Sequence, residues 1–89
     1  MATLFVRHSV EDYGAWKKVY DEVAPMQRRD GVIAQAVYHA PGDPNDVIVT
    51  HEFATTEAAQ QFLQDPDFPQ AMRRAGVSGE PIIWLGEKA

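Results

Sequence analysis

Alternating apolar and polar positions predict four β-strands in this chain, at residues 3–9, 32–40, 47–54 and 81–85. The second and third of these strands are separated by residues 41–46, whose sequence PGDPND is a dense turn signal. The two strands are therefore expected to form a hairpin.

Apolar residues at helical spacing predict a first helix over residues 13–29, with Ser9 or Asp12 as its N-terminal cap. Pro25 lies inside this stretch and lacks a backbone donor, so we expect the helix to kink or pause there. Gly31 supplies the left-handed residue that ends it.

A second helical stretch follows Thr55 or Thr56, is interrupted at residues 65–67 and continues to Gly76. The resulting order, β-α-β-β-α-β, is that of a ferredoxin-like α+β fold. We therefore predict a single domain over residues 1–89, in which a four-stranded antiparallel sheet carries helices on one face.

Both faces of the predicted sheet are apolar, although the chain offers helices for only one of them. By alternation, the face toward the helices comprises Leu4, Val6, His8, Val32, Ala34, Ala36, Tyr38, Val47, Val49, His51, Phe53, Ile82 and Trp84. Soluble monomers rarely expose a second apolar face, so we expect it to join two copies of the chain in a homodimer. The expected interface residues are Phe5, Arg7, Val37, His39, Thr50, Glu52, Ile83 and Leu85. Arg7 and Glu52 are a candidate ion pair on this face.

Composition narrows the class of protein. A chain of 89 residues with 45% hydrophobic residues suits one folded domain, and the lack of cysteine argues against a disulfide-stapled secreted module. Its first residues show no signal-peptide pattern and the chain has no transmembrane stretch, so we expect a cytoplasmic protein with no membrane partner. The net charge of −5 and the dispersed basic residues argue against nucleic acid as a partner.

Common catalytic motifs are absent from the sequence. It contains no glycine-rich phosphate loop, no dinucleotide fingerprint, no cysteine pair and no HExxH zinc signature. His8 and His51 share a sheet face by alternation, but no third ligand accompanies them, so we expect no metal site. A buried histidine that only packs in the core is the simpler reading of either residue.

Small residues opposite large ones on the helix-facing side predict a cleft between the sheet and the helices. Ala34 and Ala36 are the small residues, and clefts of this kind bind small apolar ligands. The alternative is a solid core, because aromatic residues and methionine at helical spacing usually fill space. The expected ligand-binding residues are Trp16, Tyr20, Tyr38, Phe62, Met72 and Trp84.

The order of strands and helices, the pair Glu52-Phe53 and the stretch FLQDPDF at residues 62–68 resemble the antibiotic-biosynthesis monooxygenase-like family of the dimeric α+β barrel superfamily. The resemblance implies a homodimer in which two sheets close into an α+β barrel, with each active site between one sheet and its own helices. Some members of that family oxidise aromatic polyketides with molecular oxygen and no metal or flavin, others degrade haem, and several are isomerases.

The chain departs from both branches of this family at the site positions. The haem-degrading branch has asparagine, tryptophan and histidine where this chain has His8, Phe62 and Met72, so the resemblance does not favour haem. The monooxygenase branch often has a histidine near position 62, where Phe62 again differs.

Three functions follow from these observations. The first is a cofactor-independent, monooxygenase-like enzyme for a small aromatic or polyketide-like compound, with His8 or His51 as the catalytic base and Trp16 or Tyr20 holding the ring. The second is a non-catalytic homodimeric binding module for a small apolar metabolite. The third is a structural dimer without a pocket.

Overall fold

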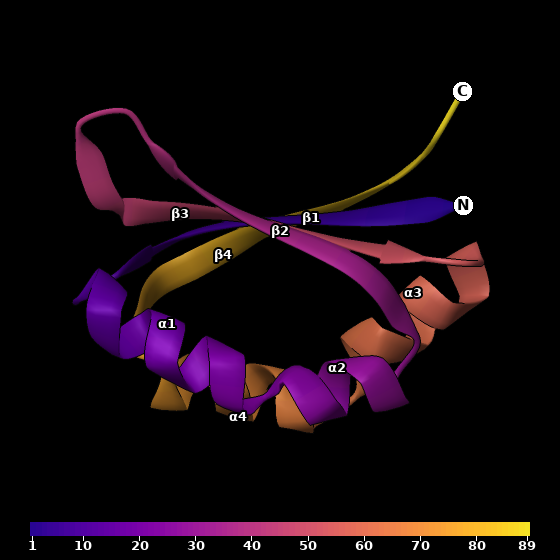
Figure 1. Cartoon of the computed structure of the whole chain (residues 1–89), viewed down its shortest axis with the longest axis horizontal. Coiled ribbons are helices and arrows are strands. Elements are labelled where there is room, and N and C mark those ends of the chain that lie inside the picture. The colour runs from indigo at the N-terminus through magenta and orange to yellow at the C-terminus, as the bar shows by residue number, and fades with distance from the viewer.

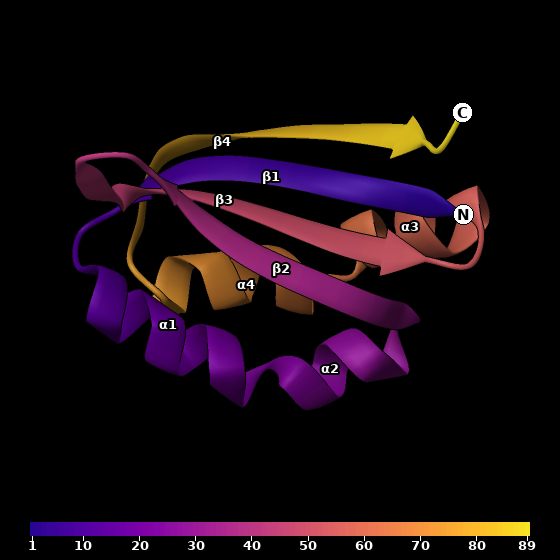
Figure 2. The ribbon, with the colours of Figure 1, turned by 45° about the horizontal axis from the view of Figure 1, so that its top comes forward.

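The computed structural model describes all 89 residues and contains the predicted order of elements. The elements are β1 (Ala2–Val10), α1 (Tyr13–Glu22), α2 (Ala24–Arg29), β2 (Val32–Ala40), β3 (Asp43–Phe53), α3 (Thr56–Gln64), α4 (Asp67–Arg74) and β4 (Val77–Glu87). The strands form one antiparallel sheet in the order β2-β3-β1-β4, and the helices cover one face of it (Figures 1 and 2). The ferredoxin-like α+β fold is therefore confirmed.

The first predicted helix is divided into α1 and α2, as Pro25 led us to expect. α1 begins after Asp12, whose carboxylate accepts a hydrogen bond from the Ala15 backbone N–H at 2.8 Å. The helical path breaks at Val23, and Pro25 then stands in the first turn of α2, where its missing donor leaves no helical bond unmade. Gly31 follows α2 with a φ of 98°, a conformation that favours glycine.

Two strand boundaries differ from the prediction. Ala40 pairs with Asp43, so the turn between β2 and β3 is only Pro41-Gly42, and the expected six-residue connection is wrong. β4 begins at Val77 rather than near residue 81 because its first residues pair with the end of β1.

The central strands have the predicted phase. Directly paired residues of an antiparallel sheet point to the same face. Leu4 of β1 lies opposite His51 of β3, and Val6 lies opposite Val49. All four are buried beneath the helices.

The phase of β2 is reversed after its first residue. Val32 pairs with Phe53 on the helix side, but Ala34 pairs with the adjacent Glu52, so Ile33 is an extra residue in a β-bulge. From Ala34 to His39, where a second shift in register follows, the side chains of β2 lie on the face opposite to the predicted one. The expected positions of Ala34, Ala36 and Tyr38 on the helix face are therefore wrong. Residues Gln35, Val37 and His39 lie on the helix face, so Val37 and His39 are also wrongly placed at the dimer interface.

The phase of β4 is also opposite to the prediction. Trp84 pairs with Phe5 on the open face, and the two rings stack with centroids 5.1 Å apart. Ile83 and Leu85 pair with Val6 and Leu4, which places them on the helix side and not at the expected interface. Four consecutive apolar residues, at positions 82–85, give alternation nothing to distinguish the two faces.

One face of the sheet carries no helix (Figure 1). Phe5, Arg7, Thr50 and Glu52 lie on this open face, as expected from the sequence. Arg7, however, donates to Asp46 at 2.6 and 3.1 Å, so its expected pairing with Glu52 is wrong. The helices themselves are all too short or too polar to cross a membrane.

Candidate functional site

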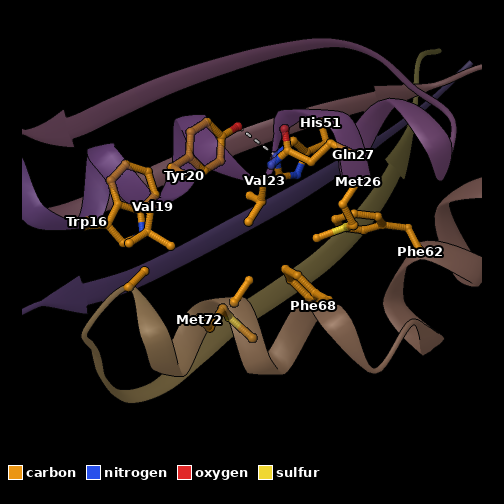
Figure 3. A pocket seen from close by; sticks show the side chains of 12 residues that line it. Trp16, Val19, Tyr20, Val23, Met26, Gln27, His51, Phe62, Phe68 and Met72 are labelled. Carbon is orange, nitrogen blue, oxygen red and sulfur yellow. Dashed lines mark hydrogen bonds between the residues drawn. The ribbon is translucent and has the colours of Figure 1, made fainter.

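A pocket lies between α1 and α2 on one side and α4 on the other, with β3 and α3 closing it (Figure 3). Its lining is formed by Trp16, Val19, Tyr20, Val23, Met26, Gln27, His51, Phe62, Phe68, Ala71, Met72 and Ala75. Every charged side chain is excluded from this lining. The pocket therefore suits a neutral, mostly apolar ligand.

Helical periodicity explains how α1 and α2 contribute to the pocket. Trp16, Tyr20, Val23 and Gln27 recur at intervals of four, three and four residues, which places them on one side of the helical pair. Trp16 stacks on Tyr20 with ring centroids 4.9 Å apart, and Tyr20 stacks on His51 at 6.0 Å. A continuous aromatic wall therefore leads from α1 to the sheet.

His51 is the polar centre of this wall. It is 3% exposed, and its Nε2 lies 2.9 Å from the Tyr20 hydroxyl and 3.5 Å from Gln27 Nε2. Figure 3 shows the imidazole between Tyr20 on one side and Phe62 on the other, and the His51 and Phe62 ring centroids are 5.5 Å apart. The other ring nitrogen, Nδ1, is buried without a hydrogen-bond partner.

Burial determines the protonation state of the imidazole. Desolvation lowers the pKa of His51 from 6.5 to about 4, so the ring is neutral near pH 7. Burial also lowers the pKa of His8. Neither candidate base therefore keeps the ordinary imidazole pKa.

This pKa makes the stability of the fold depend on pH. Unfolding restores the ordinary pKa of His51, so the unfolded chain binds a proton below about pH 6.5 that the folded chain binds only below about pH 4. The free energy of unfolding should therefore fall by about 3 kcal/mol as the pH drops through this interval. Urea unfolding at several pH values measures it. His51→Gln should flatten the profile and the exposed His39→Gln should not; equal profiles for His51→Gln and the wild type would contradict the assignment.

His8 lies on the same sheet face as His51 but outside this pocket. Leu4 is the residue opposite His51, so His8 is four residues further along β1, or about 13 Å. It contacts the wall only through Trp16, with ring centroids 5.7 Å apart. The two histidines therefore do not form one site, and no group of three or more potential metal-binding side chains is present.

The pocket is narrow. Its cavity volume is ≈ 40 Å³, which holds a few water molecules but no aromatic ring. Met26 and Met72 line it from opposite sides, and their unbranched side chains can rearrange at low cost. Val23, Met26 and Ala71 also line a wider polar groove beside the break between α1 and α2. The groove and the pocket therefore adjoin one another at these three residues.

The small residues that leave room in the pocket are not those expected. Ala71 and Ala75 lie at the pocket, whereas Ala34 and Ala36 lie on the open face. The cleft was therefore predicted with the wrong small residues. Its presence disfavours the reading as a structural dimer with a solid core.

The expected ligand-binding residues divide between the two faces. Trp16, Tyr20, Phe62 and Met72 line the pocket together with His51. Tyr38 and Trp84 lie on the open face and are wrongly placed, for the reasons given for their strands.

Sequence reasoning missed two polar residues. Gln27 is 4% exposed, lines the pocket and has an Oε1 with no hydrogen-bond partner. Gln35 accepts a hydrogen bond from the Tyr20 hydroxyl at 3.0 Å. The helical stripe could have revealed Gln27, whereas the bulge hides Gln35.

No family model and no curated protein matches the sequence. Solved structures, in contrast, share the fold over nearly the whole chain. A Bordetella bronchiseptica protein described as a candidate antibiotic biosynthesis monooxygenase has a TM-score of 0.83 at 14% identity, covering 99% of this chain and 96% of that chain. SnoaB from Streptomyces nogalater, described as a cofactor-independent oxygenase, has a TM-score of 0.75 at 15% identity, covering 99% and 94%. The chain has the fold of the antibiotic biosynthesis monooxygenase-like proteins.

A third structure of this fold extends the likeness to another organism. A Deinococcus radiodurans protein, also described as a candidate antibiotic biosynthesis monooxygenase, has a TM-score of 0.78 at 18% identity, covering 100% of this chain and 93% of that chain. The structural similarity establishes the monooxygenase-like fold. At sequence identities this low the activity has to be argued from the pocket.

Proposed function

We propose that this monooxygenase-like chain is a cofactor-independent enzyme that oxidises a small aromatic or polyketide-like compound with molecular oxygen. The observation that carries the proposal is a neutral, buried imidazole, that of His51, set in an uncharged aromatic pocket. Trp16 and Tyr20 stack on each other and line the pocket, where they provide aromatic surface for a planar ligand. The likeness to SnoaB, named as a cofactor-independent oxygenase, supports the choice of reaction.

The chemistry requires one proton acceptor. His51 takes a proton from an acidic phenol or enol, and the resulting carbanion reacts with dioxygen. One dioxygen molecule adds one oxygen atom at a ring C–H of the phenol, oxidises the ring to a quinone and releases its second oxygen atom as water, so the atoms and electrons balance without an external reductant. Although burial lowers the pKa of His51 in the empty pocket, an enolate beside the imidazolium would raise it, because the opposite charge favours the protonated ring.

Oxygen uptake tests the proposal. The wild-type protein, incubated with hydroquinone-type compounds, should consume about one molecule of oxygen per molecule oxidised, faster than buffer alone. An oxygen electrode and product mass spectrometry give both quantities. Absence of uptake with every compound that binds would contradict an oxygenase.

The second candidate is a non-catalytic binding module for a small apolar metabolite. The lowered pKa of His51 favours it, because an imidazole that resists protonation is a weak base. A binding module would show a ligand-dependent rise in Tm, as mass action requires, without oxygen uptake. The same compounds therefore separate the two functions.

The proposed partner is a second copy of the chain. Ile33, Tyr38, Ile82 and Trp84 are large apolar side chains exposed on or beside the open face of the sheet. Two such faces packed together would remove this surface from water and close the α+β barrel expected from the resemblance. We further propose a cytoplasmic location, in keeping with the absence of cysteine.

A further inference from the structure

Three side chains from different elements form a hydrogen-bonded relay that runs from the exposed edge of the sheet to the buried His51. Tyr20 of α1 donates its hydroxyl proton to Gln35 Oε1 of β2 at 3.0 Å. The same hydroxyl oxygen lies 2.9 Å from His51 Nε2 of β3. Gln35 reaches the relay because the bulge at Ile33 turns it toward the helices.

The relay determines where the imidazole carries its proton. In the orientation that the structure gives Gln35, its Oε1 faces the Tyr20 hydroxyl. This carbonyl oxygen can only accept, and a tyrosine hydroxyl has a single proton to donate. With that proton directed to Gln35, the Tyr20 oxygen must accept from His51, which requires hydrogen on Nε2. A neutral imidazole then has a free lone pair on Nδ1.

Gln27 agrees with this assignment in only one of its two amide orientations. As oriented, its amide places Nε2 at 3.5 Å from His51 Nε2 and leaves its buried Oε1 without a partner. The oxygen and nitrogen of an amide side chain are interchangeable by a half-turn. With hydrogen on His51 Nε2, this half-turn brings Gln27 Oε1 to the ring as an acceptor. Only His51 Nδ1 is then left without a partner among the buried polar atoms lining the pocket.

We propose that Gln35 is a positioning residue that acts through Tyr20 to hold His51 in the Nε2–H tautomer, so that Nδ1 is the atom that accepts a hydrogen bond or proton from a hydroxylated ligand. The role of Nδ1 toward a ligand rests on the proposed function, whereas the tautomer is a property of the ligand-free protein. Gln35 itself touches no ligand, because it is outside the pocket lining.

Nitrogen NMR of protein carrying ¹⁵N-labelled histidine tests the proposal, because the two ring nitrogens of a neutral imidazole report which one is protonated. The wild type should show His51 protonated at Nε2. Gln35→Met removes the acceptor, frees the Tyr20 proton for Nε2, and should shift the tautomer ratio toward Nδ1–H by about tenfold, the effect of one hydrogen bond. Gln35→Glu keeps an acceptor of similar length and should retain the wild-type tautomer.

Matched variants keep the test decisive. Gln35 is exposed at the sheet edge, so both substitutions should leave the far-ultraviolet circular dichroism unchanged. Tyr20→Phe removes the relay oxygen and should give the same shift as Gln35→Met. A wild type protonated at Nδ1, or a Gln35→Met variant with the wild-type ratio, would overturn the assignment.

The outcome is distinguishable from failure of the proposed function. If the tautomer responds as described but no compound supports oxygen uptake, the relay holds and the enzyme proposal fails. If oxygen uptake occurs but the His51 tautomer ratio is the same in the wild type and in Gln35→Met, the enzyme proposal holds and the positioning role fails. Hydroquinone binding, measured by calorimetry, should weaken by about tenfold in Gln35→Met and not in Gln35→Glu.

Discussion

Replacing His51 with alanine is expected to lower the rate of oxygen uptake with a hydroquinone-type substrate by about 10²–10⁴-fold, the range usual for removal of a general base. His51 is the only side chain with an ionisable ring nitrogen in the pocket lining, and Nδ1 is free to accept a proton. Substrate binding should change much less, because Trp16 and Tyr20 still provide the ring surfaces. Initial rates in an oxygen electrode, with affinity measured separately by calorimetry, give the two effects.

Variants of the two other histidines serve as controls for the lower rate of His51→Ala. His39 is exposed on β2 and outside the pocket, so His39→Gln should retain the wild-type rate. His8→Ala should lower the rate by less than about tenfold, because His8 reaches the pocket only through its contact with Trp16. A His51→Ala variant with full activity would remove His51 as the base, and a larger loss in His8→Ala would move the chemistry to that end of the sheet.

Replacing Trp84 with glutamate is expected to convert the proposed dimer into monomers. Trp84 is 46% exposed on the open face, next to Ile82 at 62%. In a face-to-face dimer each copy would bury a new carboxylate, and Arg7 on the same face is already paired with Asp46. Burying a carboxylate without a free cation is strongly unfavourable. The dissociation constant should rise by at least about 10²-fold, as for a central interface residue. Sedimentation velocity across micromolar concentrations measures the change.

The stacking of Trp84 on Phe5 requires a check on folding. Tyr38→Glu changes a more exposed residue of the same face, opposite Ile48 and not Arg7, and should dissociate the dimer without disturbing that stack. Gln60→Glu on the exposed side of α3 adds the same charge away from the sheet and should leave the dimer intact. A wild-type protein that sediments as a folded monomer would contradict the proposed assembly.

The order of elements was predictable because local signals specify it. Asp12 caps α1 as one of the two expected residues, Thr55 caps α3, and Pro25 divides the first helix. Each of these effects depends on neighbours within a few residues. The facing of the central strands β1 and β3 was also predictable. Each has a neighbouring strand on both sides, so one set of alternate residues is strongly buried.

The facing of the edge strands was not predictable, and this error propagated to the site. The bulge at Ile33 is a property of the pairing between β2 and β3 that alternation along one strand does not reveal. Alternation therefore places Tyr38 on the pocket side of the sheet, whereas the structure places Gln35 on that side. In β4 both sets of alternate residues are apolar, so the pattern could not choose between Trp84 and Leu85.

The pocket was predicted in part for a different reason. Helical spacing identifies large residues on the inner side of helices, such as Trp16 and Phe62. Both residues line the pocket. Gln27 has the same spacing but was overlooked because a polar residue is expected on the outer side of a helix. A buried polar atom without a partner becomes visible only in three dimensions.

Because α2 is only six residues long, the size of a bound ligand can affect the pKa of His51. Met26 and Gln27 are neighbours on this single short segment, one occupying the cavity and the other adjoining the ring of His51. A large ligand that displaced α2 as a unit would move the Gln27 amide away from the His51 ring. A small ligand that changed only the Met26 rotamer would leave the amide in place. The pKa of His51 would then depend on the size of the bound ligand.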